Sequence, residues 1–174
     1  PLHEGSNELM LVKSGLTAYL EKVNIPFYQI ISGRGEIAGD TMRYERIVQG
    51  LLARYSRSAA ILGIGEDGHT AGIAPNRVDF TNPLFASDEN KRLVSFFKDE
   101  GTLTSPGNRF GERITMTIKG ISQLDFLIVL VFGENKQAAL ERIFMDGSIE
   151  EVSARFLKRR DVAGKTIFIT DRDV

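Results

Sequence analysis

The stretch "SAAILGIGEDGHTAGIAP", residues 58–75, decides the fold of this 174-residue chain. Its first part, 58–64, is a continuous apolar run ending near a glycine, which is typical of a strand covered on both faces in a parallel sheet. The rest begins a loop where ligands bind in open α/β sheets, outside the carboxyl ends of the strands. The stretch therefore predicts an architecture and the place of a site within it.

The glycines of "GIGEDG", 63–68, satisfy the pattern G-x-G-x-x-G of a dinucleotide-binding turn. In that pattern the third glycine opens a long helix, and an acidic residue ends the next strand about 20 positions later. Here Gly72 and Pro75 stop any long helix, and Asp88 lies in "FASDEN", which does not have the composition of a strand. We therefore expect neither a nicotinamide nor a flavin site, and no cofactor.

The composition is that of one globular domain, 1–174. Hydrophobic residues make up 42% and charged residues 26%, and the net charge of -1 gives no overall attraction to nucleic acid or to an anionic membrane. The chain has no cysteine and only two histidines, His3 and His69, which excludes disulfides and argues against a metal site. No apolar run approaches the roughly 20 residues that span a bilayer. These features predict a cytoplasmic protein without metal, nucleic acid or membrane as partner.

Helical and strand-like patterns alternate along the chain. Helical spacing runs from an N-cap at Ser6 to Val23, a second helix is expected to be capped by Asp40, and another by a capping box of Ser148 and Glu151. A further helix is expected in "GENKQAALERIF", 133–144. Strands are expected at 27–31, 58–64, 92–97, 113–118, 125–132 and 165–170. This order predicts an α/β, Rossmann-like fold, with an open, mostly parallel sheet flanked by helices.

Asp67 and His69, on either side of Gly68, are the candidate catalytic pair. A neutral histidine is a natural general base near pH 7, and a nearby carboxylate orients its ring and stabilises its cation. Gly65 and Gly68 let a substrate approach the backbone, whose N–H groups can hold an oxyanion. The alternative is a structural turn, in which Asp67 bonds its own backbone and His69 caps the loop.

Arg113 and Lys136 are the candidate anion-binding residues. Arg113 begins "RITMT", and Lys136 lies in "GENK", between the most apolar predicted strand and the start of a helix. A cation there is close to the carboxyl ends of the sheet and to a positive helix N-terminus, which suits a phosphate group. The alternative is a solvated surface cation, which is the more usual position of any single lysine or arginine. "SGRGE", 32–36, is a weaker candidate for an anion-binding loop.

At these residues the sequence resembles the superfamily of 6-phosphogluconolactonases and glucosamine-6-phosphate isomerases/deaminases. "LGIGEDGHTAGIAP" is similar to the lactonase signature, "RITMT" to the family's Arg-Ile-Thr strand and "GENKQAAL" to its Gly-x-x-Lys turn. The "SN" at 6–7 and the final "IFITDRDV" also resemble family segments, in the same order along the chain.

The resemblance implies a lactonase of the pentose phosphate pathway that uses no cofactor or metal. His69 would activate a water that attacks the lactone carbonyl of 6-phosphogluconolactone, and Asp67 would orient His69. Arg113 and Lys136 would hold the sugar phosphate. The deaminase branch carries a catalytic Glu in D-G-H-I-A-F-N-E-P, whereas "TAGIAPN" here has no acid before Asp79, which favours the lactonase.

The resemblance also implies an N-terminal portion, with a Gly-Gly-Ser/Thr phosphate loop and an Asp-Glu-Arg motif, that these residues do not match. "PLHEGSN" is similar to the sequence just after that motif, so we expect an N-terminally truncated family fold with an exposed sheet edge and apolar face. The chain would be part of a longer protein or would complete its site as a homo-oligomer. Two further readings stay open: a sugar-phosphate-binding sensor without catalysis, and the deaminase/isomerase.

Overall fold

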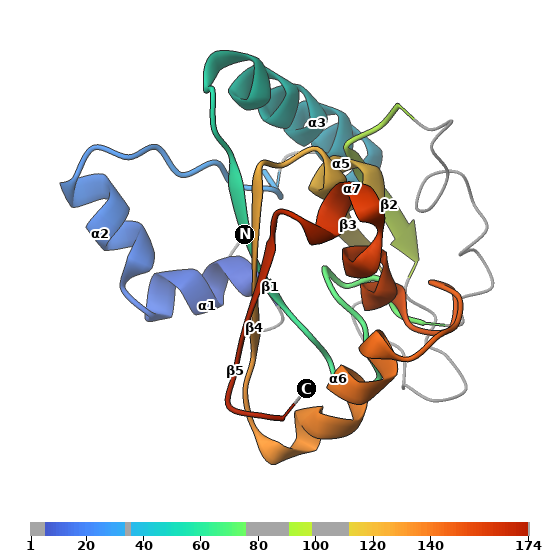
Figure 1. Ribbon diagram of the computed structural model, residues 1–174. Helices are drawn as coiled ribbons and strands as arrows, with labels where there is room; N and C mark the ends of the chain where they lie inside the picture. Colours follow the sequence, from blue (N-terminus) through green and yellow to red (C-terminus); the bar gives the residue numbers. More distant parts are fainter. Residues whose placement is uncertain (1–5, 34–35, 76–90, 99–111, 174) are drawn as a thin grey trace.

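The computed structural model describes residues 6–33, 36–75, 91–98 and 112–173 (Figure 1). Its strands are β1 (Ala59–Gly63), β2 (Val94–Lys98), β3 (Glu112–Met116), β4 (Phe126–Val131) and β5 (Thr166–Thr170). Its helices are α1 (Asn7–Lys13), α2 (Leu16–Lys22), α3 (Ile37–Arg54), α5 (Ile118–Ser122), α6 (Gln137–Phe144) and α7 (Arg160–Ala163), with short 3-10 helices η1 (Glu134–Lys136) and η2 (Ser153–Lys158). In this described part, no helix combines the length and apolar character needed to cross a bilayer.

The central sheet is parallel, with the strand order β1-β4-β5. Ile61 pairs with Ile128 of β4, which pairs with Ile167 of β5. The side chains of these three residues therefore lie on the same face of the sheet. The carboxyl ends of all three strands meet at one edge, at the bottom of Figure 1, where α6 begins. β2 and β3 form a separate antiparallel pair beside α3. The expected α/β architecture with a parallel sheet flanked by helices is confirmed.

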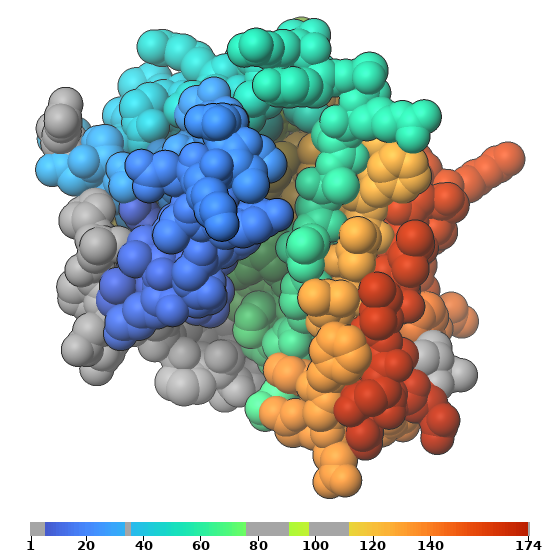
Figure 2. Space-filling view, turned by 90° about the vertical axis from the view of Figure 1, so that its left-hand side faces the viewer, coloured from blue at the N-terminus to red at the C-terminus, as the bar shows by residue number. Residues whose placement is uncertain are grey.

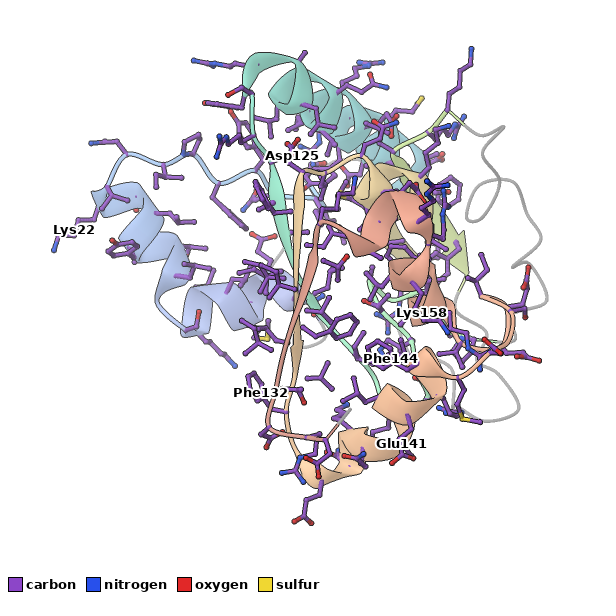
Figure 3. All side chains as sticks on the ribbon, in the orientation of Figure 1. Lys22, Asp125, Phe132, Glu141, Phe144 and Lys158 are labelled. Atoms are coloured by element: carbon purple, nitrogen blue, oxygen red, sulfur yellow. The ribbon has the colours of Figure 1, made fainter. Side chains whose placement is uncertain are left out.

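One face of the central sheet packs into the hydrophobic core. Leu62, Leu127, Val129 and Val131 alternate along β1 and β4 on this face and are nearly inaccessible. They contact the apolar side of α6 and the segment around η2, whose Phe156 is completely buried. Phe144 at the end of α6, labelled in Figure 3, contacts Phe168 of β5 with ring centroids 5.3 Å apart and ring planes tilted by 57°. This packing fixes α6 and η2 against the strands that carry the candidate loops.

The other face of the sheet is open to solvent. Ile61 is 73% exposed and Ile167 56% exposed, and Figure 2 shows β1, β4 and β5 uncovered on this side. Exposed apolar side chains continue through Phe126, Ile169 and Phe132. Strands of a parallel sheet are ordinarily covered on both faces, so the apolar sequence of β1 is explained only in part by the contacts this chain makes. The expected exposed apolar face is thus present.

The N-terminal segment forms two helices where the pattern predicted one. α1 ends at Lys13, and Gly15, with a φ of 80°, turns the chain before α2 begins. The Ser14 hydroxyl donates to the Leu11 carbonyl over 2.8 Å and so competes with the helical hydrogen bonds. Ser6 does cap α1, as expected, by accepting from the Glu8 amide.

The prediction of a strand at 27–31 is wrong. The carbonyl groups of Gln29 and Ile30 accept hydrogen bonds from Arg43 Nη2, at 2.7 and 2.6 Å, and the Ser32 amide donates to Asp40. Side chains of α3 therefore take the backbone groups that a neighbouring strand would use. The same contact explains why Asp40 is not the N-cap of α3: the helix already begins at Ile37, and the Asp40 carboxylate is buried against the preceding loop.

The capping box forms, but the α-helix expected after it does not. The Ser148 amide donates to Glu151 and the Glu151 amide to Ser148 Oγ, both at 3.3 Å. The chain then turns and continues as the 3-10 helix η2. The Ser153 hydroxyl and the Ala154 amide of this helix donate hydrogen bonds to carbonyl groups of the loop after β1.

Candidate active site

The loop after β1, residues 64–75, folds back on itself at the carboxyl edge of the sheet. The Gly65 amide donates to the His69 carbonyl over 2.8 Å, and the Gly68 amide donates to the Gly65 carbonyl over 3.0 Å. Thr70 Oγ1 closes the turn by donating to the Gly63 carbonyl at the end of β1. Gly68 has a φ of 87°, a left-handed conformation that favours glycine. The loop therefore has a defined conformation around Asp67 and His69.

Asp67 and His69 form a hydrogen-bonded pair. His69 Nδ1 lies 2.6 Å from Asp67 Oδ1, and the same oxygen accepts the His69 backbone amide at 3.0 Å. The Asp67 side chain is 16% exposed and that of His69 45% exposed, so the imidazole is reachable while its partner is largely covered. With Nδ1 as the hydrogen donor to the carboxylate, Nε2 is the basic nitrogen of the neutral ring.

The carboxyl group of Asp67 is held in its charged form. Burial acts to raise its pKa, but the hydrogen bonds from His69 and the charge of that ring outweigh it, and the pKa lies below the ordinary value. Oδ2 of Asp67 is buried and accepts no hydrogen bond from the described residues. The carboxylate is thus fixed through Oδ1, the atom that orients the imidazole. Asp67 Oδ1 bonds the His69 ring, as expected for a catalytic pair, and also the His69 backbone amide, as expected for a structural turn. The two alternatives are therefore both compatible with this carboxylate.

η2 and β3 support this loop from behind. Ser153 Oγ donates to the Ile73 carbonyl over 2.5 Å, and the Ala154 amide donates to the Gly68 carbonyl over 3.2 Å. From β3, Thr115 Oγ1 donates to the Ala71 carbonyl over 2.5 Å. Loop carbonyls that would otherwise be buried without partners are satisfied by residues more than 40 positions away.

The turn after β4 lies against the same loop. It begins at Gly133, whose φ of 99° suits glycine and whose amide donates to Asp171 at the end of β5. Asn135 Nδ2 donates to Glu66 Oε1 over 2.5 Å, which ties the turn to the loop after β1. Lys136, the next residue, ends η1 and directly precedes α6. The candidate phosphate-binding lysine is thereby attached to the segment that carries the candidate base.

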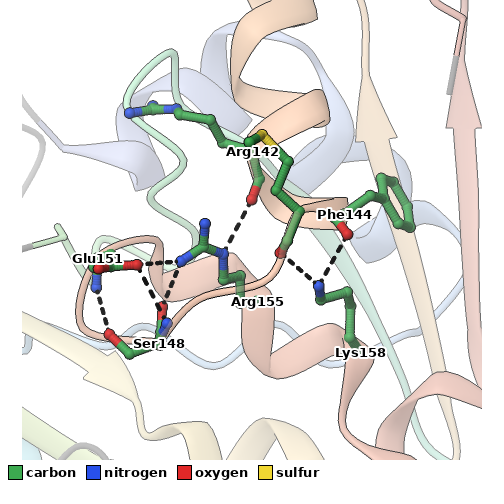
Figure 4. Close-up of polar contacts among 7 residues, drawn as sticks. Arg142, Phe144, Ser148, Glu151, Arg155 and Lys158 are labelled. Carbon is green, nitrogen blue, oxygen red and sulfur yellow. Dashed lines mark hydrogen bonds and ion pairs between the residues drawn. The ribbon is translucent and has the colours of Figure 1, made fainter.

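A cluster of polar contacts holds the other end of α6 (Figure 4). The buried Arg155 donates to the carbonyl groups of Arg142 and Ser148 and forms an ion pair of 2.6 Å with Glu151. Lys158 donates to the carbonyls of Phe144 and Met145 at the end of the helix. At the same time Arg142 Nη2 donates to the Glu66 carbonyl over 3.2 Å. α6 is thus connected at both ends to the segments that form the site.

Arg113 lies in β3, near the end of the loop in space. A Cβ atom on Gly72 would lie 3.8 Å from Arg113 Nη1, so the guanidinium is next to the residues that follow His69. Arg113 and Lys136 therefore both lie in or beside segments that contact the loop of the Asp67–His69 pair. Their binding of a phosphate stays a prediction.

The oxyanion role expected for Gly65 and Gly68 finds no free donor in this conformation. Both amides are engaged within the loop, one with His69 and one with Gly65. An oxyanion on either amide would require a different loop conformation, and the role stays a prediction. In the described part of the chain, no three side chains of the kinds that bind metals gather into a site.

Several residues of this site were not expected from the sequence: Ser153, Thr115, Asn135, Arg142 and Asp171 support the loops through contacts that span 38 to 85 positions. Thr115 in "RITMT", Asn135 in "GENK" and Asp171 after the last strand lie in segments that the sequence singled out, but those patterns did not identify them as supports of the loop. Ser153 and Arg142 had no such signal, so their role follows from the tertiary arrangement alone.

The chain is similar to known proteins over most of its length. The family model of glucosamine-6-phosphate isomerases/6-phosphogluconolactonase matches residues 1–168. A 6-phosphogluconolactonase of Chlamydia pneumoniae is 28% identical over 132 residues, covering 76% of this chain and 46% of that protein. One from Nostoc is 30% identical over 153 residues, covering 83% and 55%. The chain spans about half the length of these relatives.

Solved structures show the same fold. The 6-phosphogluconolactonase of Trypanosoma brucei matches with a TM-score of 0.55 at 24% identity, covering 80% of this chain and 54% of that one. That of Thermotoga maritima has a TM-score of 0.56 at 23% identity, covering 78% and 52%. A monomeric glucosamine-6-phosphate deaminase also matches, with a TM-score of 0.55 at 18% identity and coverage of 83% and 56%. The backbone alone therefore does not separate the two branches.

Proposed function

Because this chain belongs to the family of glucosamine-6-phosphate isomerases and 6-phosphogluconolactonases, we propose that it carries the base of a 6-phosphogluconolactonase site, which hydrolyses 6-phosphogluconolactone to 6-phosphogluconate. The observation that carries the proposal is the bond of 2.6 Å between His69 Nδ1 and Asp67 Oδ1, beside the carboxyl ends of the parallel strands. The names of the relatives support the lactonase branch.

The proposed reaction follows from the polarity of this pair. His69 Nε2 accepts a proton from a water molecule as its oxygen attacks the lactone carbonyl carbon. Asp67 holds the Nδ1 proton and stabilises the imidazolium that forms. The tetrahedral intermediate then collapses, the bond between the carbonyl carbon and the ring oxygen breaks, and the imidazolium returns its proton to that oxygen. The products are the open-chain acid and an unchanged pair.

Arg113 and Lys136 are proposed to bind the phosphate group of the substrate. A phosphate gains charge-assisted hydrogen bonds from arginine and lysine side chains. The Asn135–Glu66 bond supports this proposal, because it joins the segment of Lys136 to the loop of His69. A charged sugar phosphate does not cross a bilayer unaided, and we also propose that the protein acts in the cytoplasm. The expected homo-oligomer stays a prediction.

The alternatives make different demands on the same residues. A sensor needs the cations but no base, and the carboxylate bonded to His69 Nδ1 is a feature of acid–base chemistry. The deaminase branch carries a glutamate shortly after the histidine, whereas residues 70–75 here contain no acid. These two observations favour the lactonase.

The test is the hydrolysis of fresh 6-phosphogluconolactone by the 174-residue chain, compared with the spontaneous rate and with His69→Ala and Asp67→Asn. We expect acceleration by the unmodified chain and a loss of about 10²–10⁴-fold in either variant, the usual contribution of general base catalysis. Sugar-phosphate binding with no acceleration would support the sensor instead. Release of ammonia from glucosamine 6-phosphate, with no lactone hydrolysis, would support the deaminase.

A further inference from the structure

Gly65 lies directly against the imidazole of His69. A Cβ atom on Gly65 would come closer than 3.0 Å to both Nδ1 and Cε1 of that ring, and would lie 2.8 Å from Asp67 Oδ1. Cβ atoms in folded proteins do not approach other atoms this closely. The space that a side chain at position 65 would fill is therefore the space in which the ring and its hydrogen-bonded carboxylate oxygen lie.

The backbone of Gly65 does not by itself require glycine. Its φ is not among the positive values of this chain, unlike that of Gly68 at 87°. The Gly65 amide also donates to the His69 carbonyl, so the two main chains are joined and the imidazole is the part that is free to rotate. A larger residue at 65 would thus act mainly on the ring, which would leave its position by rotation about χ1 and χ2.

Gly63 provides an internal comparison two residues earlier. A Cβ atom there would meet no atom within 4 Å, although both glycines belong to the same G-x-G pattern. Of these two glycines, only Gly65 is therefore needed to make room for a side chain. In this chain the group that lies next to the second glycine is the side chain of the candidate base, and not a dinucleotide.

We propose that Gly65 is a positioning residue for His69, whose missing side chain provides the slot that keeps the imidazole in line with Asp67. The inference rests on the proposed function for its catalytic meaning, but the geometry of the pair can be tested without it. With an added methyl group the ring and Asp67 Oδ1 cannot keep their positions, and the bond of 2.6 Å is lost.

The first test is NMR spectroscopy of the imidazole in the 174-residue chain. The chain has two histidines, so in a His3→Gln background every imidazole signal belongs to His69. We compare Gly65→Ala with Gly63→Ala. Gly63→Ala is expected to keep the downfield Nδ1 proton that bonds Asp67, and Gly65→Ala to lose it and to show mixed ring tautomers. An unchanged His69 spectrum in a folded Gly65→Ala protein would overturn the proposal.

A double-mutant cycle covers the case in which Gly65→Ala unfolds the protein. We measure thermal unfolding of Gly65→Ala, His69→Ala and the pair of substitutions together. If overlap with the ring is the reason for the loss, Gly65→Ala lowers the melting temperature less when residue 69 is alanine. Equal losses with and without the imidazole would show that position 65 serves the backbone, and the proposal would fail.

The lactonase assay then separates this inference from the proposed function. If the chain hydrolyses the lactone, Gly65→Ala should lower kcat at least about tenfold with little change in KM, within the range of general base effects, and Gly63→Ala should keep full activity. A Gly65→Ala enzyme with unchanged kcat would contradict the inference while the proposed function stood. If no chain is active, the proposed function fails for this chain, and the NMR comparison alone decides the inference.

Discussion

The hydroxyl of Ser153 donates a hydrogen bond of 2.5 Å to the carbonyl of Ile73, across 80 positions of the sequence. Ser153 is fully buried, and its hydroxyl also lies 3.4 Å from the Gly68 carbonyl. One side chain of η2 thus contacts the loop of the candidate base at its turn and at its end. The conformation of that loop depends on a residue far along the chain.

Replacing Ser153 with alanine should destabilise the protein. The substitution leaves the buried Ile73 carbonyl without its donor, which costs about 1–3 kcal/mol in the free energy of unfolding. Urea denaturation measures this change. Ser122→Ala is the matched control, because Ser122 Oγ is buried but has no hydrogen-bond partner among the described residues, and its loss should stay within about 0.5 kcal/mol. Equal effects of the two variants would contradict the role of Ser153.

Asp67 should stabilise the fold in a pH-dependent way. Its pKa in the folded chain lies below the ordinary value of 3.8, despite burial, because His69 donates to the carboxylate. The contribution is therefore present above the unfolded pKa and is lost as the pH falls through the lower, folded pKa. Urea unfolding of the unmodified chain and of Asp67→Asn should differ most near neutral pH, and the difference should shrink below about pH 4. A difference that grew on acidification would have the wrong sign.

Lys136→Ala should weaken substrate binding. Losing a charge-assisted hydrogen bond to phosphate costs about 1.5–3 kcal/mol, which is roughly a 10- to 150-fold rise in KM. Steady-state kinetics, or inhibition by inorganic phosphate if turnover is slow, measures the effect. Lys22→Ala is the control, since Lys22 ends α2 and points away from the rest of the chain (Figure 3). A rise in KM shared by both variants would show a general charge effect rather than a site.

Arg155→Ala should destabilise the chain more than Glu151→Gln does. Arg155 is 8% exposed and donates to the carbonyls of Arg142 and Ser148, so its removal loses two hydrogen bonds of about 1 kcal/mol each besides the packing of a buried side chain. Glu151 is 62% exposed in its side chain, and exposed ion pairs contribute at most about 1 kcal/mol. Thermal and urea unfolding of both variants give the comparison. A larger loss in Glu151→Gln would show that the ion pair, not the carbonyl contacts, holds this end of α6.

Local patterns predicted the strands that lie in the core and failed where other parts of the chain compete for the backbone. The apolar runs at 58–64, 125–132 and 165–170 became β1, β4 and β5, because burial of their alternating side chains outweighs other local preferences. The segment 27–31 has a similar composition but gives its carbonyls to Arg43. Such competition from a residue of another element is invisible in a short window of sequence.

For the candidate site, too, the sequence could predict the arrangement of some residues but not of others. Asp67 and His69 could be proposed from the sequence because they are two residues apart in one turn, and a short spacing fixes their distance. Arg113 and Lys136 could be proposed but not placed, since their positions depend on β3 and on the turn after β4. The structure attaches both segments to the loop, through Thr115 and through Asn135.

The sequence by itself determined the parallel strands, the turn with its histidine and carboxylate, and the family to which these residues belong. Each of these depends on side-chain periodicity or on a spacing of a few residues. Only the tertiary structure decided that Ser153 and Thr115 hold the loop, that Glu66 joins it to the lysine turn, and that Gly65 makes room for the imidazole. The physical reason is that hydrogen bonds and steric contacts act over a few ångströms in space, whatever the separation along the chain.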